Sequence, residues 1–214
     1  MLLLDEPLAA LDARTRLEVR TELRRHLEGV DGPVLLVTHD PLEAMVLTDR
    51  LLVIEDGHVV QHGTPAQVAR QPATQYVARL VGLNLYPGTL GSADGTVHLD
   101  AGGRLVATPP EPLPPVGTNV LVALPPSAIA VHTEPPGHAS PRNVWPGIIT
   151  GLEPLADRVR AQVEGQPSAL VDLTAAAVAD LRLRPGTQVW LAAKATELDV
   201  YPDSRRPDAT TASP

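Results

Sequence analysis

Two short apolar runs near the start of the chain each end in polar residues. Residues 1–4 are wholly apolar and stop at Asp5 and Glu6, and residues 34–37 are followed, after one threonine, by His39. The proline after Glu6 disfavours helical geometry there, so the first run is predicted to be a buried strand rather than part of a helix. Ligands of open α/β sheets bind beyond the carboxyl ends of the strands, so these polar residues are expected at one edge of a sheet.

A helical pattern connects the two predicted strands. Asp12 is a suitable N-cap, and the glycines and proline within residues 29–33 end the pattern. The apolar side of this helix is predicted to consist of Leu17, Val19, Leu23 and Leu27. Together these segments predict a strand–helix–strand unit of an α/β domain.

Turn and cap signals organise the next forty residues. Asp40 precedes a proline and is predicted to cap a short helix, with Glu43 closing a capping box. The pair Asp56-Gly57 separates two apolar runs and predicts a hairpin. A further helix is expected over residues 73–81, closed by Gly82.

From about residue 85 the pattern changes to short alternating segments separated by glycine, proline and aspartate, which predicts β structure. We therefore expect a boundary near residues 82–87, with domains over 1–84 and 85–202 and a disordered tail over 203–214.

The second half contains an internal repeat. Residues 117–131 align without a gap to residues 186–200, and each copy follows a proline-containing turn. Two such units predict two small barrels packed in tandem. One short helix, capped by Thr174, is expected within the second unit.

Composition narrows the possible functions. The 214 residues include no cysteine, which excludes disulfides and thiol catalysis, and the net charge is −8. No basic cluster stands out and aromatic residues are few, so we expect no nucleic-acid partner. No apolar run is long enough to span a membrane, and we expect a soluble chain that reaches a membrane only through a partner.

The residues at the predicted sheet edge suit phosphoryl transfer. Asp5 can hold Mg²⁺ through water, and Glu6 can orient or deprotonate an attacking water. Residues 1–82 resemble the ATP-binding subunit of ABC transporters, a P-loop NTPase with ATP and Mg²⁺ as cofactors. The resemblance implies that Asp5 is the Walker B metal ligand, Glu6 the catalytic base, Asp12 part of the D-loop, and His39 the switch histidine.

Other motifs of that family do not occur in this sequence. There is no Gly-x-x-x-x-Gly-Lys-Ser/Thr phosphate loop, no Q-loop and no LSGGQ-type signature. We expect this chain to neither bind nor hydrolyse ATP by itself. It would then be a truncated chain, a product with a wrongly assigned start, or half of a split subunit.

The second half resembles the TOBE or Mop-like domain that follows the ATPase domain in several importers. An oxyanion needs converging N–H and O–H donors with one or two positive charges. Two motifs of the molybdate branch supply them, and the resemblance implies a site made of Ser140, Arg142, Asn143, Lys194, Ala195 and Thr196. Molybdate and tungstate, which share charge and nearly share size, are not distinguished.

The expected function is the ATP-binding subunit of an importer for molybdate or a related oxyanion. The family implies a homodimer on transmembrane permease subunits at the cytoplasmic face of the membrane, with the barrel domain sensing the oxyanion. One alternative is a non-enzymatic oxyanion-binding protein with a vestigial ATPase remnant. Another is an importer ATPase for sugar, polyamine, sulfate or iron.

Overall fold

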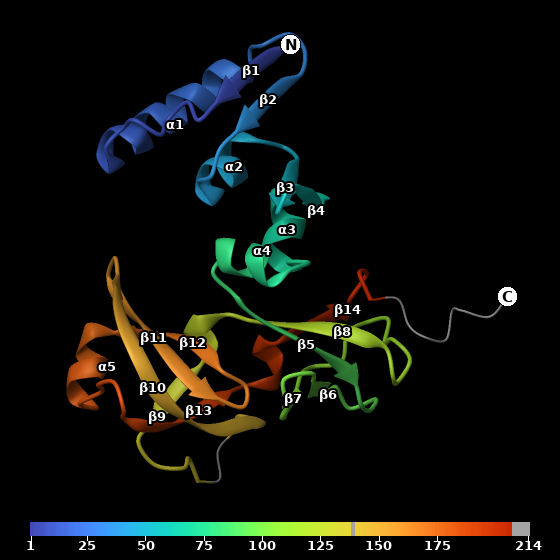
Figure 1. The fold of residues 1–214 in the computed structure, drawn as a ribbon, viewed down its shortest axis with the longest axis vertical. Helices are drawn as coiled ribbons and strands as arrows, with labels where there is room; N and C mark the ends of the chain where they lie inside the picture. The colour runs from blue at the N-terminus through green and yellow to red at the C-terminus, as the bar shows by residue number, and fades with distance from the viewer. Residues whose placement is uncertain (138–139, 207–214) are drawn as a thin grey trace, which may run out of the picture. The chain divides into compact units, whose positions relative to one another are not determined.

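The computed structural model describes residues 1–137 and 140–206, which divide into two compact units at Ala69 and Arg70 (Figure 1). The division lies earlier than the boundary predicted after residue 84. The reason is α4 (Gln75–Leu80), whose Ala78 is fully buried in an apolar cluster with Leu85 of the following strand. This helix therefore belongs to the second unit.

The first unit begins with the predicted strand–helix–strand arrangement. β1 (Leu2–Asp5) and β2 (Val34–Val37) pair in parallel, and α1 (Ala13–Leu27) connects them. Asp12 caps α1 as predicted, since its carboxylate accepts from the backbone N–H groups of the third and second residues that follow it.

The buried side of α1 differs from the prediction. Leu17 is 63% exposed, whereas the other three predicted apolar residues are half-buried. Arg16 and Arg20, one turn apart, lie on the packed side instead, where both guanidinium groups form ion pairs with Asp40. Charge pairing with the loop after β2 thus sets the orientation of this helix.

Two elements follow β2. Asp40 caps α2 (Pro41–Leu47), but Glu43 does not close the predicted capping box: it is buried, and its carboxylate accepts from the Thr38 hydroxyl at 2.8 Å. The predicted hairpin is present as β3 (Leu51–Glu55) and β4 (His58–Gly63), turning on Asp56-Gly57 with positive φ at both residues. Helix α3 (Pro65–Arg70) follows.

The second unit contains two five-stranded antiparallel sheets. The first sheet has the order β14-β8-β5-β6-β7, with β5 (Asn84–Leu90), β6 (Thr96–Leu99), β7 (Arg104–Val106), β8 (Asn119–Leu124) and β14 (Asp199–Pro202). The second sheet has the order β12-β11-β10-β13-β9, with β9 (Ala130–His132), β10 (Asn143–Leu155), β11 (Arg158–Gly165), β12 (Ala169–Thr174) and β13 (Gln188–Ala193). The prediction of an all-β second half is confirmed.

The predicted repeat corresponds to two identical sets of elements. β8 leads through the 3₁₀ turn η1 (Pro126–Ala128) into β9, and β13 leads through η2 (Ala195–Glu197) into β14. However, β9 pairs with β13 and β14 pairs with β8, so each copy gives its last strand to the other copy's sheet. The two copies are therefore not independent barrels.

The repeat extends further than predicted. The sequence Asn-x-aromatic-Pro-Gly opens both β5 and β10, at residues 84–88 and 143–147. The strand registers are equivalent: Asn84 lies opposite Leu124, and Asn143 lies opposite Ala193. The second unit is thus an intertwined pair of homologous halves.

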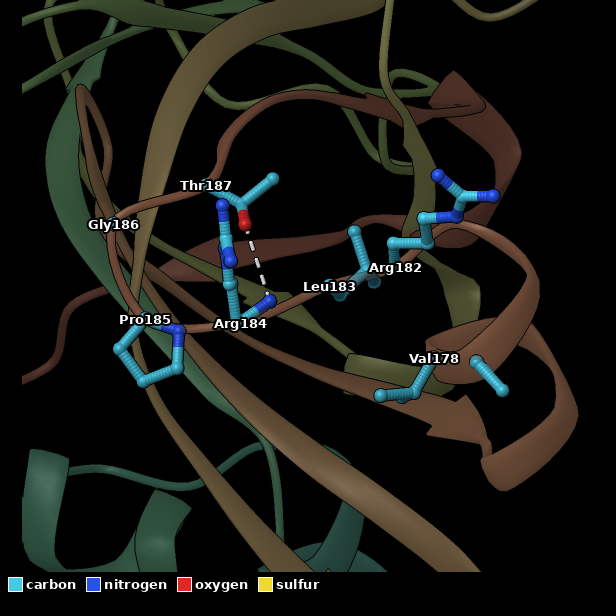
Figure 2. Close-up of a pocket in the computed structure, with 8 residues that line it drawn as sticks. Val178, Arg182, Leu183, Arg184, Pro185, Gly186 and Thr187 are labelled. Atoms are coloured by element: carbon cyan, nitrogen blue, oxygen red, sulfur yellow. Dashed lines mark hydrogen bonds between the residues drawn. The ribbon is translucent and has the colours of Figure 1, made fainter.

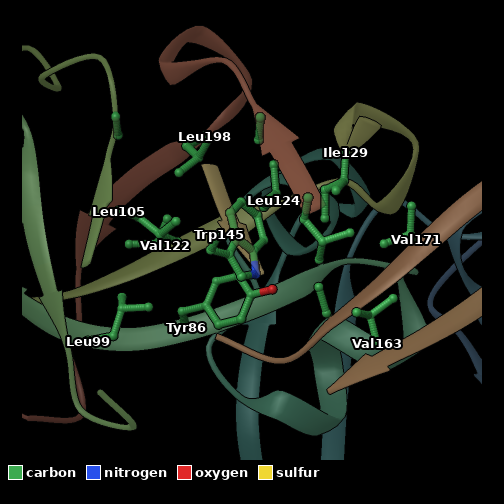
Figure 3. Packing of buried hydrophobic residues seen from close by; sticks show 14 of the residues in the cluster. Tyr86, Leu99, Leu105, Val122, Leu124, Ile129, Trp145, Val163, Val171 and Leu198 are labelled. Carbon is green, nitrogen blue, oxygen red and sulfur yellow. The ribbon is translucent and has the colours of Figure 1, made fainter. Parts of the chain in front are cut away.

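One apolar core serves both sheets. It includes Tyr86 and Val122 from the first sheet and Trp145 and Val163 from the second (Figure 3). The indole N–H of Trp145 donates to the Pro167 carbonyl at 2.9 Å, which allows this large side chain to be buried. Because both halves fill a single core, neither half buries its apolar face alone.

The remaining elements follow the predictions in part. Thr174 caps α5 (Ala175–Asp180) as expected. Asp203, predicted to begin the disordered tail, is buried, and its N–H donates to the Asn119 carbonyl; residues 207–214 of that tail lie outside the described residues. Among the residues that the structure describes, no helix is long and apolar enough to cross a membrane.

Candidate functional site

Glu6 and His39 lie together where β1 and β2 end. The Glu6 N–H donates to the Val37 carbonyl at 2.9 Å, and the backbone turns at Glu6 with φ of 45°. The Glu6 carboxylate then accepts from the His39 backbone N–H at 3.1 Å and from His39 Nδ1 at 2.7 Å. The two parallel strands thus bring a carboxylate and an imidazole into direct contact, at the edge where the sequence predicts them.

The contact fixes the chemistry of the histidine. An ionised carboxylate can only accept, so Nδ1 carries the proton and Nε2 is the remaining acceptor on a ring that is 78% exposed. The hydrogen bond that His39 donates to Glu6, and then the negative charge of Glu6, raise the pKa of His39. His39 is therefore oriented by Glu6 while its outer edge faces solvent.

Asp5 and Asp12 are placed differently. Asp5 ends β1 opposite Val37 and is exposed. Asp12 is occupied by its capping hydrogen bonds, and those from Thr15 hold the pKa of its carboxyl below the usual value. Within residues 1–137 and 140–206, no three histidine or acidic side chains are grouped to hold a metal ion. Asp5 offers one carboxylate, which suits Mg²⁺ only where water and phosphate oxygens complete its shell.

A supporting network beside His39 escaped the sequence analysis. Asp40 accepts from two N–H groups of α2 and pairs with Arg20 at 3.5 Å and Arg16 at 3.8 Å, while its own N–H donates to Thr38. Arg16 also donates to the Leu11 carbonyl at 2.9 Å. These contacts hold the segment that carries His39 against α1. In the sequence, only the spacing of one helical turn between the two arginines indicates a shared partner.

Four of the six residues predicted to bind an oxyanion are exposed at one end of the second sheet. Asn143 and Ala193 are opposite each other in the sheet. Arg142 precedes Asn143 and Lys194 follows Ala193, so these two residues are adjacent at the end of the two strands. The exposed residues of the predicted set are Ser140, Arg142, Lys194 and Thr196. Ala195 is half-buried, and its carbonyl accepts from the Thr108 N–H at 2.9 Å.

Asn143 does not fit the predicted role. Its side chain is buried, its Nδ2 donates to the carbonyls of Val106 and Ala193, and its Oδ1 accepts from the Val106 N–H. Both side-chain N–H groups are thus used by the backbone, which leaves none for an anion. Asn143 joins the two sheets instead.

Two pockets lie elsewhere in the second unit. One, of about 1010 Å³, is formed after α5, where the Arg184 N–H donates to the Thr187 hydroxyl at 3.1 Å and Arg182 is exposed (Figure 2). The other, of about 610 Å³, is lined by residues of β10 and β13 that include Pro146 and Trp190. Neither pocket is lined by the residues predicted to bind an oxyanion.

Comparison with known families identifies the segment from β10 to β14. The family model described as the TOBE domain matches residues 139–200, a range that contains both predicted oxyanion motifs. The chain contains a TOBE domain. The β10–β14 segment is therefore the TOBE match, and the homologous half that precedes it shares its core and its strands.

The relatives of the whole chain are ATP-binding subunits of ABC importers, as the sequence analysis predicts. A molybdenum import ATP-binding protein, ModC of Mycobacterium tuberculosis, is 36% identical over 94% of this chain and 55% of that protein. A sn-glycerol-3-phosphate import ATP-binding protein, UgpC 2 of Agrobacterium fabrum, is 32% identical over 88% of this chain and 48% of that protein. The chain spans about half the length of these curated relatives.

Solved structures also match this chain. The molybdate-bound crystal structure of the cytoplasmic molybdate-binding protein ModG matches with a TM-score of 0.49 and 21% identity, covering 55% of this chain and 94% of that protein.

Proposed function

We propose that this chain forms part of the ATP-binding subunit of an ABC importer and that its TOBE domain binds molybdate or tungstate. The observation that carries the proposal is the similarity to a molybdenum import ATP-binding protein along 94% of this chain. The contact between Glu6 and His39 at the ends of two parallel strands supports the ATPase half.

In the ATPase half, each residue has a role that its geometry allows. Asp5 would hold Mg²⁺ through water, and Glu6 would polarise the attacking water. His39, held by Glu6 through Nδ1, would donate from Nε2 to the γ-phosphate when its ring is protonated, and Asp12 would face a second subunit. This sequence contains no phosphate loop, so ATP would be held only together with residues supplied from outside it.

In the TOBE half, the oxyanion would bind where the β10 and β13 strand ends leave Arg142 and Lys194 adjacent. Ser140 and Thr196 would add hydroxyl donors, and Ala195, the first residue of η2, would add a backbone N–H. Because these side chains are exposed, a second copy in a homodimer could close the site. The homodimer would act on membrane permease subunits from the cytoplasmic side, and oxyanion binding would bias its closure.

A different cargo is the second candidate. Relatives of this chain include import proteins for sn-glycerol-3-phosphate, for Fe(3+) ions in Rhizobium meliloti and for spermidine/putrescine in Thermobifida fusca. A non-enzymatic oxyanion-binding protein is the third. These candidates differ in whether the TOBE domain binds a tetrahedral oxyanion and whether the complete assembly hydrolyses ATP.

Calorimetric titration of the full chain with molybdate, tungstate, sulfate and Mg-ATP tests the proposal. We expect molybdate and tungstate to bind and sulfate to bind more weakly. Arg142→Ala and Lys194→Ala should each weaken binding by about tenfold or more, since hydrogen bonds to charged groups contribute about 1.5–3 kcal/mol. Arg184→Ala, which removes an exposed arginine elsewhere in the domain, is the matched control. Absence of oxyanion binding would favour another cargo.

A further inference from the structure

The outer sheet faces of the two homologous halves of the second unit differ in how far they are buried. In the first sheet, the outward residues Leu85, Leu121 and Tyr201 are all buried. They form an apolar cluster with Ala78 of α4, the helix that precedes β5 (Figure 1). The first half thus shows what fits this kind of face: a short helix that places a small side chain against it.

Polar contacts hold that helix in place. The Tyr201 hydroxyl donates to the Pro72 carbonyl at 2.9 Å, and the Gln75 side chain donates to the Leu85 carbonyl. Hydrogen bonds as well as apolar packing therefore hold this helix on the sheet.

The same face of the second sheet is largely uncovered. By register, Val144 is equivalent to Leu85, Trp190 to Leu121 and Pro146 to a proline of β5. Val144 is 40% exposed, whereas Leu85 is 3% exposed. Trp190 is half-buried and, with Pro146, lines the pocket of about 610 Å³.

Within the described part of the second half, no helix covers this face. Residues 133–137 and 140–142, which precede β10 as α4 precedes β5, contain no helix in the part of the chain that the structure describes. Ile148 extends the apolar face and is 45% exposed. Glu164, which lies opposite Ile148 on β11, adds one exposed negative charge to this face. A tryptophan beside exposed aliphatic residues is typical of the centre of a protein interface.

We propose that the Val144–Trp190 face, defined as Val144, Pro146, Ile148 and Trp190, binds a short helix of another protein chain. The helix would resemble α4, with alanine or valine against the sheet, and would carry a lysine or arginine near Glu164. The homology of the two halves supports this binding site, independently of oxyanion binding and ATP hydrolysis.

The probe is a peptide of residues 71–83 of this chain, which contains the helix that covers the equivalent face. A side-chain link between positions 76 and 80, which lie on the side of the helix opposite Ala78, keeps the peptide helical and retains Gln75, since short isolated helices are marginal in water. The peptide is titrated into the ¹⁵N-labelled full chain. We expect saturable NMR shifts at Val144, Ile148 and the Trp190 indole, and none at Leu155.

Matched variants locate the binding. Val144→Glu should weaken binding by about tenfold or more, because it places a charge on the face. Leu155→Glu, on the same strand and 42% exposed, should bind like the wild type. A peptide with Ala78→Glu should not bind.

Three results would overturn the proposal. One is no shift at peptide concentrations up to about 1 mM, the range of weak complexes. Another is a shift at Leu85 and Leu121, which would mean exchange with α4 on the first sheet. The third is a concentration-dependent shift at Val144 without peptide, removed by Val144→Glu, which would make a second copy of this chain the occupant.

Discussion

Asn84 and Asn143 stand at equivalent positions, and the side-chain amide of each joins the two sheets of the second unit. Asn84 on β5 donates to and accepts from the backbone of Leu170 on β12, at 2.9 and 2.7 Å. Asn143 on β10 makes the same pair of bonds with Val106 on β7, at 2.8 and 2.7 Å. β12 and β7 are edge strands of the opposite sheets. Each asparagine therefore pairs with the N–H and C=O of one edge-strand residue, groups that would otherwise lack a partner in the sheet.

Replacing Asn143 with alanine should therefore destabilise the domain strongly. The change leaves the N–H and C=O of Val106 without their partner and removes a bond to the Ala193 carbonyl. We expect the free energy of unfolding to fall by about 2–4 kcal/mol. Urea denaturation followed by tryptophan fluorescence measures it, with Gln188→Ala on the exposed side of β13 as control. A loss no larger than that of the control would mean that water replaces the amide.

Two glycines of β10 should respond oppositely to alanine. A Cβ at Gly147 would lie 2.5 Å from Val163 Cγ1 and 3.0 Å from the Glu164 carbonyl oxygen, so β10 and β11 would have to separate. Gly147→Ala should cost about 1–3 kcal/mol, as overpacking does. At Gly151 the nearest atoms are the Gln162 side chain at 3.4 Å, and Gly151→Ala should be nearly neutral. Thermal unfolding of the two variants compares them directly, and equal shifts in Tm would contradict the prediction.

The pKa of His39 should depend on Glu6. The hydrogen bond and charge of Glu6 raise it above 6.5, so the interaction stabilises the fold fully below about pH 6.5, and this contribution is lost as the pH rises through the raised value. Glu6→Gln should return the pKa of His39 toward 6.5. An NMR titration of the ring Cε1–H measures it, with Glu22→Gln on α1 as control. An unchanged pKa would show that the contact does not persist in solution.

Asp40 combines two roles that substitutions can separate. Asp40→Asn can still cap α2 but loses the charge that pairs with Arg16 and Arg20, whereas Asp40→Ala loses both. Loss of an N-cap typically costs about 0.5–2 kcal/mol. We expect the α2 amides to exchange with solvent faster in Asp40→Ala than in Asp40→Asn. Equal exchange in the two variants would mean that the ion pairs, and not the cap, hold this segment.

Local chemistry predicted much of the fold, because a cap or a turn depends on a few adjacent residues. The caps at Asp12, Asp40 and Thr174 and the hairpin at Asp56-Gly57 are all present. The contact of Glu6 with His39 follows from two parallel strands that end together.

Long-range pairing was not predictable in the same way. Nothing local to Asn143 distinguishes an anion ligand from a bridge between sheets, because its partner Val106 lies far away in the sequence. The shared Asn-x-aromatic-Pro-Gly stretch at residues 84–88 and 143–147 was the available signal. Its offset differs from that of the repeat at residues 117–131, so the two stretches do not align in the register of that repeat. The burial of Arg16 and Arg20 likewise depends on Asp40, which follows another strand.

The exchange of β9 and β14 has a consequence for biosynthesis. β14 completes the first sheet, yet among the strands of residues 1–137 and 140–206 it comes last in chain order. On the ribosome, β8 of the earlier half has no β14 beside it until residues 199–202 emerge from the exit tunnel. A chain that stopped before residue 199 would leave the first sheet without β14 and the edge of β8 unpaired, so folding of the first half depends on a strand that comes from the second.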